Sequence, residues 1–327
     1  MSSSIQRIGV FTSGGDAPGM NAAIRAVVRT GIFHKKEVFG IMRGYEGMIE
    51  GDFVKLGARS VGNILQRGGT ILKTARSDEF KTAEGRKQAY DQLRKEGIDA
   101  LIAIGGDGTF TGLHKLYQEY QLPSLCIPGT IDNDIAGTDY TIGFDTATNT
   151  AVEAIDKIRD TALSHNRLFF IEVMGRNSGY IALYSGIAGG AGAIIIPESE
   201  TSFDKVYELL TAGEITNKRS NLVVIAEGSK IGGANEIARK VAERTDYFDI
   251  KVTILGHLQR GGTPTYFDRV LASKLGVASV EGLINGKTDA MVGVRDNKIV
   301  YNLFDSVMNR PHEIDMDMLR IAKILSI

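Results

Sequence analysis

The sequence predicts a protein of the α/β class with mostly parallel sheets, and two observations carry this prediction. Short apolar runs of strand length alternate along the 327 residues with longer segments of helical period. Glycine is also abundant, with 39 residues, and the glycines cluster directly after the predicted strands. This distribution indicates loops in which the backbone comes close to a ligand.

Seven short apolar runs are predicted to be strands. Two of them, residues 100–104 (ALIAI) and 124–127 (SLCI), are almost uniformly apolar, which is typical of strands buried on both faces of a parallel sheet. The seven runs are residues 8–12, 100–104, 124–127, 168–174, 193–196, 222–226 and 252–255.

Three segments between these strands have the apolar spacing of amphipathic helices. In one of them Val152, Ile155 and Ile158 fall on one face, with charged residues opposite. The three segments are residues 22–30, 148–161 and 268–283. A chain of this length has room for about two domains, and since no Pro- or Ser-rich linker is present, ordinary loops must join them.

The composition excludes several classes of function. Lysine and arginine (38) nearly balance aspartate and glutamate (39), so we expect no nucleic-acid partner and no membrane surface as partner. No apolar stretch approaches the ~20 residues of a membrane span, and the N-terminus lacks the apolar segment of a signal peptide. The single cysteine, Cys126, excludes a disulfide within the chain and fits a reducing compartment. We therefore expect a cytoplasmic protein.

Two loops with glycine and aspartate follow two different predicted strands. They are residues 105–109 (GGDGT) and 128–134 (PGTIDND). Glycine lets backbone N–H groups approach phosphate oxygens, while Asp107, Asp132 and Asp134 supply carboxylates that can hold Mg²⁺ or accept a proton. Either loop alone could be an acidic turn. Together they favour a nucleotide-dependent kinase.

Further polar and glycine-rich loops also come just after predicted strands. In open α/β sheets ligands bind at the carboxyl ends of the strands, so these loops are candidates to share one cleft. Residues 12–21 contain Gly14 and Gly15 before a predicted helix, which favours an anion site, with a tight strand–helix turn as the alternative. The other loops carry the sequences MGRNSG, AEG and GHLQRGG.

Five arginines lie beside these loops, where a planar guanidinium can clamp a phosphate. Each alone could be a solvated surface residue, but as a set they imply a substrate that carries its own phosphate. They are Arg67, Arg76, Arg167, Arg176 and Arg260. His257 precedes Arg260 by three residues and is a candidate ligand for a phosphate or hydroxyl group. The other histidines are scattered, so no zinc site is expected.

From about residue 7 to the C-terminus, the motifs resemble those of the bacterial ATP-dependent 6-phosphofructokinases. The matching segments, in family order, are TSGGDAPGMNAAIR, RGGT, IGGDGT, PGTIDNDI, GTDYTIGFDTA, EVMGRNSG and LGHLQRGGTP. The resemblance implies transfer of the γ-phosphoryl group of Mg-ATP to the 1-hydroxyl of fructose 6-phosphate. The products would be fructose 1,6-bisphosphate and ADP, at the committed step of glycolysis.

The resemblance also implies roles for individual residues. Asp132 would be the general base, Asp107 would hold Mg²⁺ through water, and Arg76 and Arg176 would stabilise charge on the transferring group. The implied catalytic set is Asp132, Thr130, Asp134, Gly15, Arg76 and Arg176. The implied ATP site is Gly15, Arg76, Ser77, Gly106, Asp107, Gly108 and Thr109. The implied sugar-phosphate site is Thr130, Asp132, Arg167, Met174, Gly175, Arg176, Glu227, Lys251, His257 and Arg260.

With this resemblance we expect two Rossmann-like three-layer domains with the active site in the cleft between them. Residues 1–142 plus 256–308 would form a large ATP-binding domain, and 143–255 plus 309–327 a smaller sugar-phosphate-binding domain. The resemblance further implies a homotetramer with shared active sites, because the residues matching Arg167 and Lys251 reach in from a neighbouring subunit.

The phosphoryl donor can be predicted from two glycines. Pyrophosphate-dependent relatives carry Asp after GGD and Lys after the Pro of the second loop, whereas this chain has Gly108 and Gly129. A bare glycine leaves room for the α-phosphate and ribose that a carboxylate would repel. ATP is therefore the expected donor.

The chain departs from the family pattern at several positions. Lys251 stands where an arginine is usual, so we expect a weaker grip on the sugar phosphate. At the effector site, which would bind ADP or phosphoenolpyruvate, Arg25, Arg29, Arg159 and Lys218 match the pattern. Three other positions differ, namely Gly192, Ala58 and Asn63, and we expect weak or altered allostery.

Two alternatives remain open from the sequence. One is a kinase of another sugar phosphate, because small changes in a pocket alter substrate choice. The other is a non-catalytic metabolite-sensing homologue. The presence of Asp132, Asp107, Arg76 and Arg176 weighs against the sensor.

Overall fold

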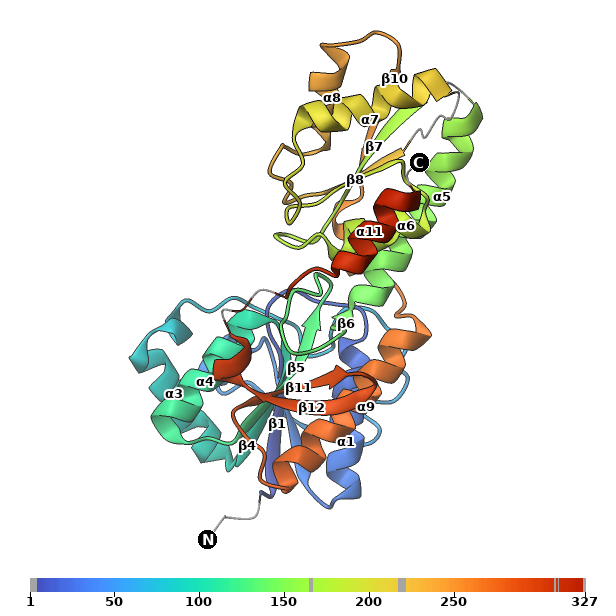
Figure 1. The fold of residues 1–327 in the computed structure, drawn as a ribbon. Coiled ribbons are helices and arrows are strands. Elements are labelled where there is room, and N and C mark those ends of the chain that lie inside the picture. The colour runs from blue at the N-terminus through green and yellow to red at the C-terminus, as the bar shows by residue number, and fades with distance from the viewer. Residues whose placement is uncertain (1–4, 165–166, 217–221, 309, 311, 326–327) are drawn as a thin grey trace. The chain divides into compact units, whose positions relative to one another are not determined.

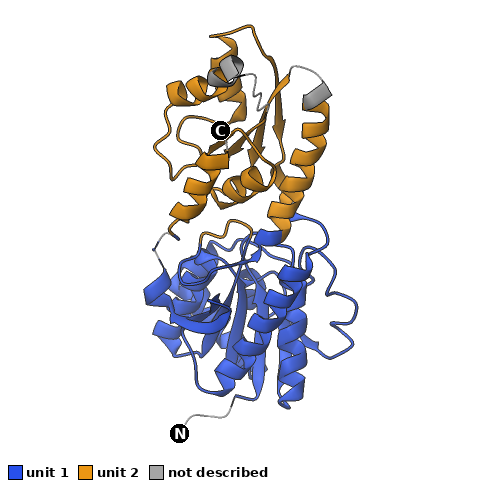
Figure 2. Ribbon diagram, turned by 45° about the vertical axis from the view of Figure 1, so that its right-hand side comes forward, with its two compact units in different colours: residues 1–130, 135–145, 260–312 blue, residues 131–134, 146–259, 313–327 orange. Residues whose placement is uncertain are grey.

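The computed structural model describes residues 5–164, 167–216, 222–308, 310 and 312–325. The chain divides into two compact units and passes from one to the other several times (Figure 2). Unit 1 consists of Met1–Thr130, Ile135–Asp145 and Arg260–His312. Unit 2 consists of Ile131–Asp134, Thr146–Gln259 and Glu313–Ile327.

Unit 1 is built around an eight-stranded sheet in the order β12-β11-β5-β4-β1-β2-β3, with β6 paired to β5 (Figure 1). The pairs β2–β3 and β11–β12, at the two edges, are antiparallel, and the other described pairs are parallel. The strands are β1 (Arg7–Thr12), β2 (Glu37–Ile41), β3 (Phe53–Leu56), β4 (Ala100–Gly105), β5 (Ser124–Thr130), β6 (Ile142–Gly143), β11 (Ala290–Arg295) and β12 (Lys298–Leu303).

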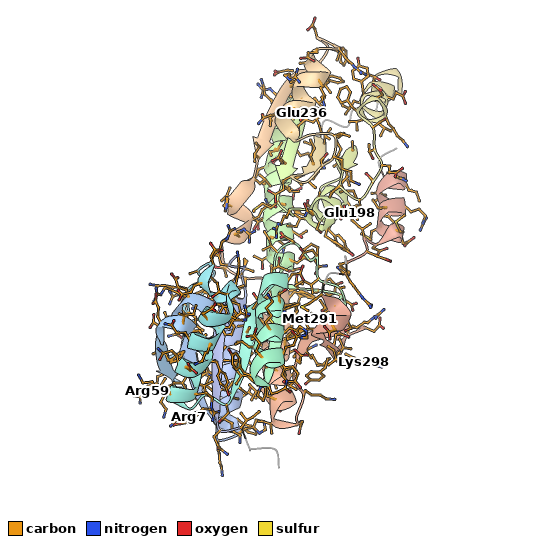
Figure 3. All side chains as sticks on the ribbon, turned by 90° about the vertical axis from the view of Figure 1, so that its left-hand side faces the viewer. Arg7, Arg59, Glu198, Glu236, Met291 and Lys298 are labelled. Atoms are coloured by element: carbon orange, nitrogen blue, oxygen red, sulfur yellow. The ribbon has the colours of Figure 1, made fainter. Side chains whose placement is uncertain are left out.

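Helices cover both faces of this sheet and complete a three-layer unit (Figure 1). On one face α1 packs against α9, and Gly276 allows the close approach because a Cβ there would lie 2.6 Å from the Cβ of Ala26. On the other face Phe11, Phe110 and Met291 (Figure 3) belong to one buried cluster. The helices are α1 (Met20–Phe33), α2 (Tyr45–Glu50), η1 (Glu79–Lys81), α3 (Ala83–Glu96), α4 (Asp107–Tyr120), α9 (Tyr266–Ile284) and α10 (Phe304–Val307).

Unit 2 has a four-stranded, fully parallel sheet in the order β10-β7-β9-β8. Its core packs Phe170 of β7 with Val206 of α7 and Ile237 of α8, while α6 contacts the sheet and also packs against α11. The strands are β7 (Arg167–Val173), β8 (Ala193–Ile195), β9 (Leu222–Ala226) and β10 (Asp249–Ile254). The helices are α5 (Phe144–Ser164), which begins in unit 1, α6 (Tyr180–Ala188), α7 (Phe203–Thr216), α8 (Ala234–Ala242), η2 (Gly256–Arg260), whose last residue belongs to unit 1, and α11 (Met316–Leu325).

The predicted α/β class with mostly parallel sheets is confirmed. The strand predicted at residues 252–255 begins earlier, at Asp249, because β10 is an edge strand whose first residues alternate between polar and apolar. Within the described part of the chain, no helix combines the length and the apolar character needed to cross a membrane.

The only cysteine of the chain, Cys126, lies in the middle of β5 and is fully buried. Burial raises the pKa of its thiol well above the usual value. We expect no reaction with an aromatic disulfide reagent in the native protein and release of one thiol after unfolding in guanidinium, measured by absorbance. Rapid labelling of the native protein would contradict this burial.

Candidate active site

The glycine-containing loops after β1 and β4 and the end of β5 meet at the carboxyl end of the unit 1 sheet. β4 lies between β1 and β5, with Thr12 opposite Ile104 and Gly105 opposite Pro128. The backbone N–H of Ser13 donates to the carbonyl of Ile104 over 3.1 Å, which extends the pairing past the end of β1. The carboxyl ends of β1, β4 and β5 therefore bring these loops together, as the strand order of an open α/β sheet requires.

The GGDGT loop forms the start of α4. Gly105 must be glycine, because a Cβ there would lie 2.5 Å from the carbonyl oxygen of Ser13. Thr109 is buried, and its hydroxyl donates to that same oxygen over 3.4 Å. Gly106 precedes the helix and Asp107 begins it, with the Asp107 side chain exposed. The helix N-terminus thus presents backbone N–H groups and a carboxylate to solvent.

Gly106 and Gly108 both face open space. A Cβ built on either would meet no heavy atom within 4 Å beyond the adjacent residues and the backbone of the helix itself. These two positions therefore leave open space beside the first turn of α4.

The loop after β1 is held close to Arg260. Gly14 has a φ of +84°, and a Cβ on Gly15 would lie only 2.6 Å from a terminal nitrogen of Arg260. That nitrogen donates to the carbonyl of Asp16 over 3.4 Å. The guanidinium of Arg260 and the backbone of Gly15 therefore occupy one small region of unit 1.

Two buried residues that the sequence did not single out bind the segment before Arg76 and hold it at the carboxyl end of the unit 1 sheet. The hydroxyl of Thr12 donates to the carbonyl of Lys73 over 2.9 Å. The Asn21 amide donates to the carbonyls of Arg67 and Gly68, both at 3.1 Å, and its oxygen accepts from the N–H of Ile71 at 2.8 Å. Thr12 and Asn21 thus position the chain that leads to Arg76 and Ser77.

The segment after Arg76 is also fixed. The hydroxyl oxygen of Ser77 accepts from the N–H of Phe80 over 3.2 Å, and Arg76 itself is exposed. Arg86, which is buried, donates to the carbonyl of Lys81 at 2.6 Å and pairs with Glu119 at 2.6 Å. The ion pair joins α3 to α4, and the hydrogen bond to Lys81 ties η1 to α3.

The second acidic loop belongs to unit 2 from Ile131 to Asp134. Asp132 is buried, Asp134 is half-buried, and Asn133 between them has a φ of +49°. The hydroxyl of Ser178 donates to the carbonyl of Asp132 over 2.8 Å. Asp132 is therefore fastened to the loop that follows β7, which contains Arg176.

The loops after β7 and β9 form one compact structure. The carboxylate of Glu227 accepts from the backbone N–H of Arg176 at 2.7 Å and of Gly175 at 3.3 Å. Gly175 has a φ of +140°, and a Cβ there would lie 2.3 Å from the carbonyl of Ser178. Glu198, labelled in Figure 3, accepts from the N–H of Gly179 at 2.8 Å.

The structure thus brings together part of the predicted sugar-phosphate site. Met174, Gly175, Arg176 and Glu227 lie at the carboxyl end of the unit 2 sheet, and the exposed His257 follows β10 at the same end.

Arg167 and Lys251 do not join this group within one chain. Arg167 is the first residue of β7, and a strand of that length places it about 20 Å from the loop after Val173. Lys251 lies in the first half of β10, which runs parallel to β7. Both basic side chains therefore belong to the opposite, amino end of the sheet.

The predicted effector residues are distributed over both units. Arg25 and Arg29 lie on α1, and Arg159 on α5 approaches Gly190, whose added Cβ would lie 3.1 Å from an Arg159 nitrogen. Lys218 lies outside the described residues.

In the described ranges, no group of three or more His, Cys, Asp or Glu side chains is arranged to hold a metal ion. Mg²⁺ is usually bound in a different way, through one or two carboxylates together with substrate phosphates. The exposed Asp107 carboxylate at the N-terminus of α4 fits that arrangement.

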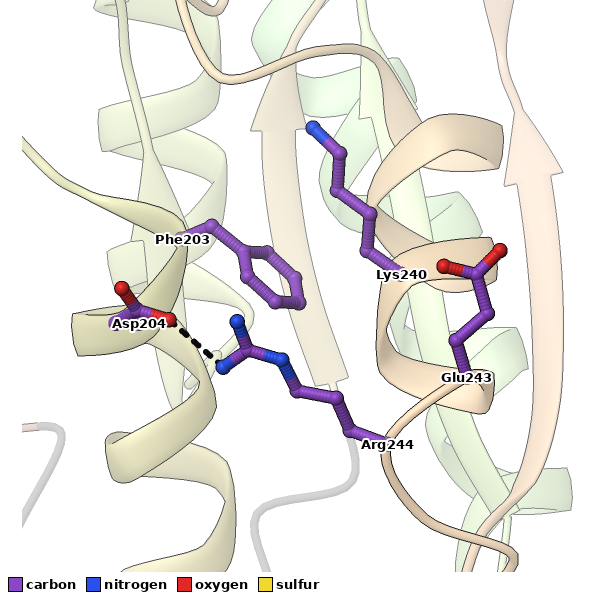
Figure 4. A pocket seen from close by; sticks show the side chains of 5 residues that line it. All are labelled: Phe203, Asp204, Lys240, Glu243 and Arg244. Carbon is purple, nitrogen blue, oxygen red and sulfur yellow. Dashed lines mark ion pairs between the residues drawn. The ribbon is translucent and has the colours of Figure 1, made fainter.

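A cavity of about 350 Å³ lies elsewhere in unit 2, between α7 and α8 (Figure 4). The Arg244 guanidinium pairs with Asp204 at 2.7 Å and sits 4.7 Å from the ring centre of Phe203. The cavity is lined by Phe203, Asp204, Lys240, Glu243 and Arg244, none of which is a predicted site residue.

Comparison with known proteins identifies the family of this chain. The family model for phosphofructokinase matches residues 7–283. The ATP-dependent 6-phosphofructokinase of Cytophaga hutchinsonii is 54% identical to this chain, over 98% of this chain and 98% of the relative. That of Halalkalibacterium halodurans is also 54% identical, over 99% of this chain and 100% of the relative. Among solved structures, the phosphofructokinase of Pichia pastoris in the T-state superposes with a TM-score of 0.87 at 37% identity, over 94% of this chain and 36% of that longer one. The chain therefore belongs to the phosphofructokinase family.

Proposed function

We propose that this chain is an ATP-dependent 6-phosphofructokinase, which transfers the γ-phosphoryl group of ATP to the 1-hydroxyl of fructose 6-phosphate. The observation that carries this proposal is the 54% identity, over almost the full length of both chains, to enzymes of that name. The open glycine positions beside α4 support it, because they leave space for a nucleotide.

In the proposed mechanism, Asp132 takes the proton of the 1-hydroxyl as that oxygen forms a bond to the γ-phosphorus. The bond from the γ-phosphorus to the bridging oxygen breaks, and ADP leaves with its electron pair. Arg76 and Arg176 stabilise the charge on the phosphoryl oxygens. The N–H of Gly15 and the Thr130 hydroxyl contact the transferring phosphoryl group. Asp134 is a second carboxylate in the loop that carries Asp132.

The nucleotide would bind at the unit 1 edge formed by β1 and β4. Asp107 would hold Mg²⁺, and this ion would neutralise phosphate charge when bound with ATP. The groups that would line the nucleotide site are Gly15, Arg76, Ser77, Gly106, Asp107, Gly108 and Thr109.

The sugar phosphate would bind to groups from two copies of the chain. One copy would supply Met174, Gly175, Arg176, Glu227, His257 and Arg260. The position of Arg167 and Lys251 at the opposite end of the unit 2 sheet supports a contribution from a neighbouring subunit, since no side chain spans about 20 Å. A homotetramer, a cleft between the predicted domains and an effector site for ADP or phosphoenolpyruvate remain predictions from the sequence.

One coupled assay of ADP or phosphate release tests this function. The full chain is supplied with ATP or pyrophosphate and with a panel of sugar phosphates. We expect turnover with ATP and fructose 6-phosphate. Turnover only with another sugar phosphate would favour the first alternative, and absence of any turnover would favour the sensor.

Lys251→Arg is expected to lower KM for fructose 6-phosphate by about two- to fivefold, because a guanidinium can bind a phosphate through two parallel hydrogen bonds. The measurement is KM at saturating ATP. Lys240→Arg is the matched control, since Lys240 lies in the same unit and pairs with Glu236 at 2.7 Å beside the cavity. An unchanged or higher KM in Lys251→Arg would refute the expectation.

A further inference from the structure

Three charged residues share one face at the amino end of the unit 2 sheet. In the parallel pairing of β10 with β7, Asp249 lies directly opposite Arg167. Lys251 is two residues further along β10, so its side chain points to the same face as that of Asp249. β10 is one of the two edge strands of this sheet.

Asp249 contacts both basic residues, with one carboxylate oxygen for each. The Nε of Arg167 donates to Oδ2 of Asp249 over 3.0 Å, and the Nζ of Lys251 lies 2.7 Å from Oδ1. The side chains of Arg167, Asp249 and Lys251 are 29%, 50% and 44% exposed, so all three remain accessible to a ligand. The two basic groups lower the pKa of the Asp249 carboxyl, Lys251 more than Arg167.

This arrangement leaves donors on both basic groups. A guanidinium has further N–H groups on its two terminal nitrogens beyond Nε, and an ammonium has three N–H groups. Two long basic side chains next to each other repel and lose conformational freedom when they bind one anion. A carboxylate that holds both in place reduces these costs.

We propose that Asp249 is a positioning residue for the sugar phosphate, holding Arg167 and Lys251 side by side so that they bind one phosphate group as a unit. The inference rests on the proposed function, in which these two residues reach the substrate. Asp249 itself does not touch the substrate; it acts through the two cations. The competing explanation is a set of surface ion pairs that only ties β10 to β7, which would add little even to stability.

Asp249→Asn is the decisive variant, because it keeps the size of the side chain and removes its charge. We expect KM for fructose 6-phosphate to rise about three- to tenfold, as for coupled neighbouring residues, with kcat and KM for ATP within about twofold of the unmodified enzyme. Asp249→Glu should recover most of the affinity, since a carboxylate is restored. Asp204→Asn, which breaks the Asp204–Arg244 pair in the same unit, is the matched control and should leave KM unchanged.

The outcomes separate the two proposals. If the unmodified enzyme turns over fructose 6-phosphate and Asp249→Asn has an unchanged KM, the positioning role is overturned. A lower KM also overturns it, because the carboxylate would then compete with the phosphate for the two cations. Absence of turnover in the unmodified enzyme would overturn the proposed function instead, while fructose 6-phosphate binding measured by calorimetry would still report whether Asp249→Asn weakens affinity.

Discussion

Asp132→Asn is expected to lower kcat for phosphorylation of fructose 6-phosphate by about 10²- to 10⁴-fold, the usual contribution of a general base. The amide has the same shape as the carboxylate but cannot accept the proton of the attacking hydroxyl. The measurement is kcat in the coupled ADP assay, with KM for both substrates determined in parallel.

The structure predicts that this variant keeps its fold. Asp132 is fastened through its backbone carbonyl to the Ser178 hydroxyl at 2.8 Å, a contact that the substitution leaves in place. The melting temperature is the control and should stay close to that of the unmodified enzyme. Retention of full turnover by a folded Asp132→Asn enzyme would remove Asp132 from the role of base.

Gly108→Asp is expected to lower kcat/KM for ATP by about 100-fold, because a carboxylate next to nucleotide phosphates costs several kcal/mol of like-charge repulsion. Gly108 lies in the first turn of α4, where an added Cβ meets open space, so the fold accommodates the side chain. A carboxylate in the first turn of a helix even favours folding. Initial rates over a range of ATP concentrations give the value.

Gly108→Asn separates charge from size in this experiment. It adds a side chain of the same volume without the negative charge, and we expect a much smaller loss of kcat/KM for ATP. Equal losses in both variants would mean that space alone selects the donor. No loss in Gly108→Asp would show that this position does not face the nucleotide.

The three central strands β1, β4 and β5 of the unit 1 sheet and all four strands of the unit 2 sheet could be predicted from the sequence, whereas β2, β3, β11 and β12 of unit 1 could not. β4 and β5 are buried along almost their whole length, so their residues form continuous apolar runs. β3 and β12 lie at the edges of the unit 1 sheet, where exposed polar residues such as Lys55 interrupt the pattern. β2 contains Gly40, which makes room for Leu72 but lowers strand propensity.

The candidate site was also predictable only in part. Glycines and aspartates that follow strands can be recognised as motifs, because the residues of one loop are adjacent in the sequence. The contacts of Thr12, Asn21 and Ser178 join positions 46 or more residues apart in the chain, so no local pattern reveals them. Asp249 was missed for a related reason, since its partner Arg167 is 82 positions away and becomes its neighbour only through the register of β7 and β10.

The length of β7 has a mechanical consequence. The strand is hydrogen-bonded to β10 on one side and to β9 on the other, so it cannot slide along its own axis independently of the sheet. At one end it carries Arg167, and at the other it leads into Gly175 and Arg176. In an assembly where these ends serve two different substrate molecules, a displacement of the whole sheet along this strand would alter both sites together. Communication between subunits would then need no relay of side chains, only one strand that belongs to two sites.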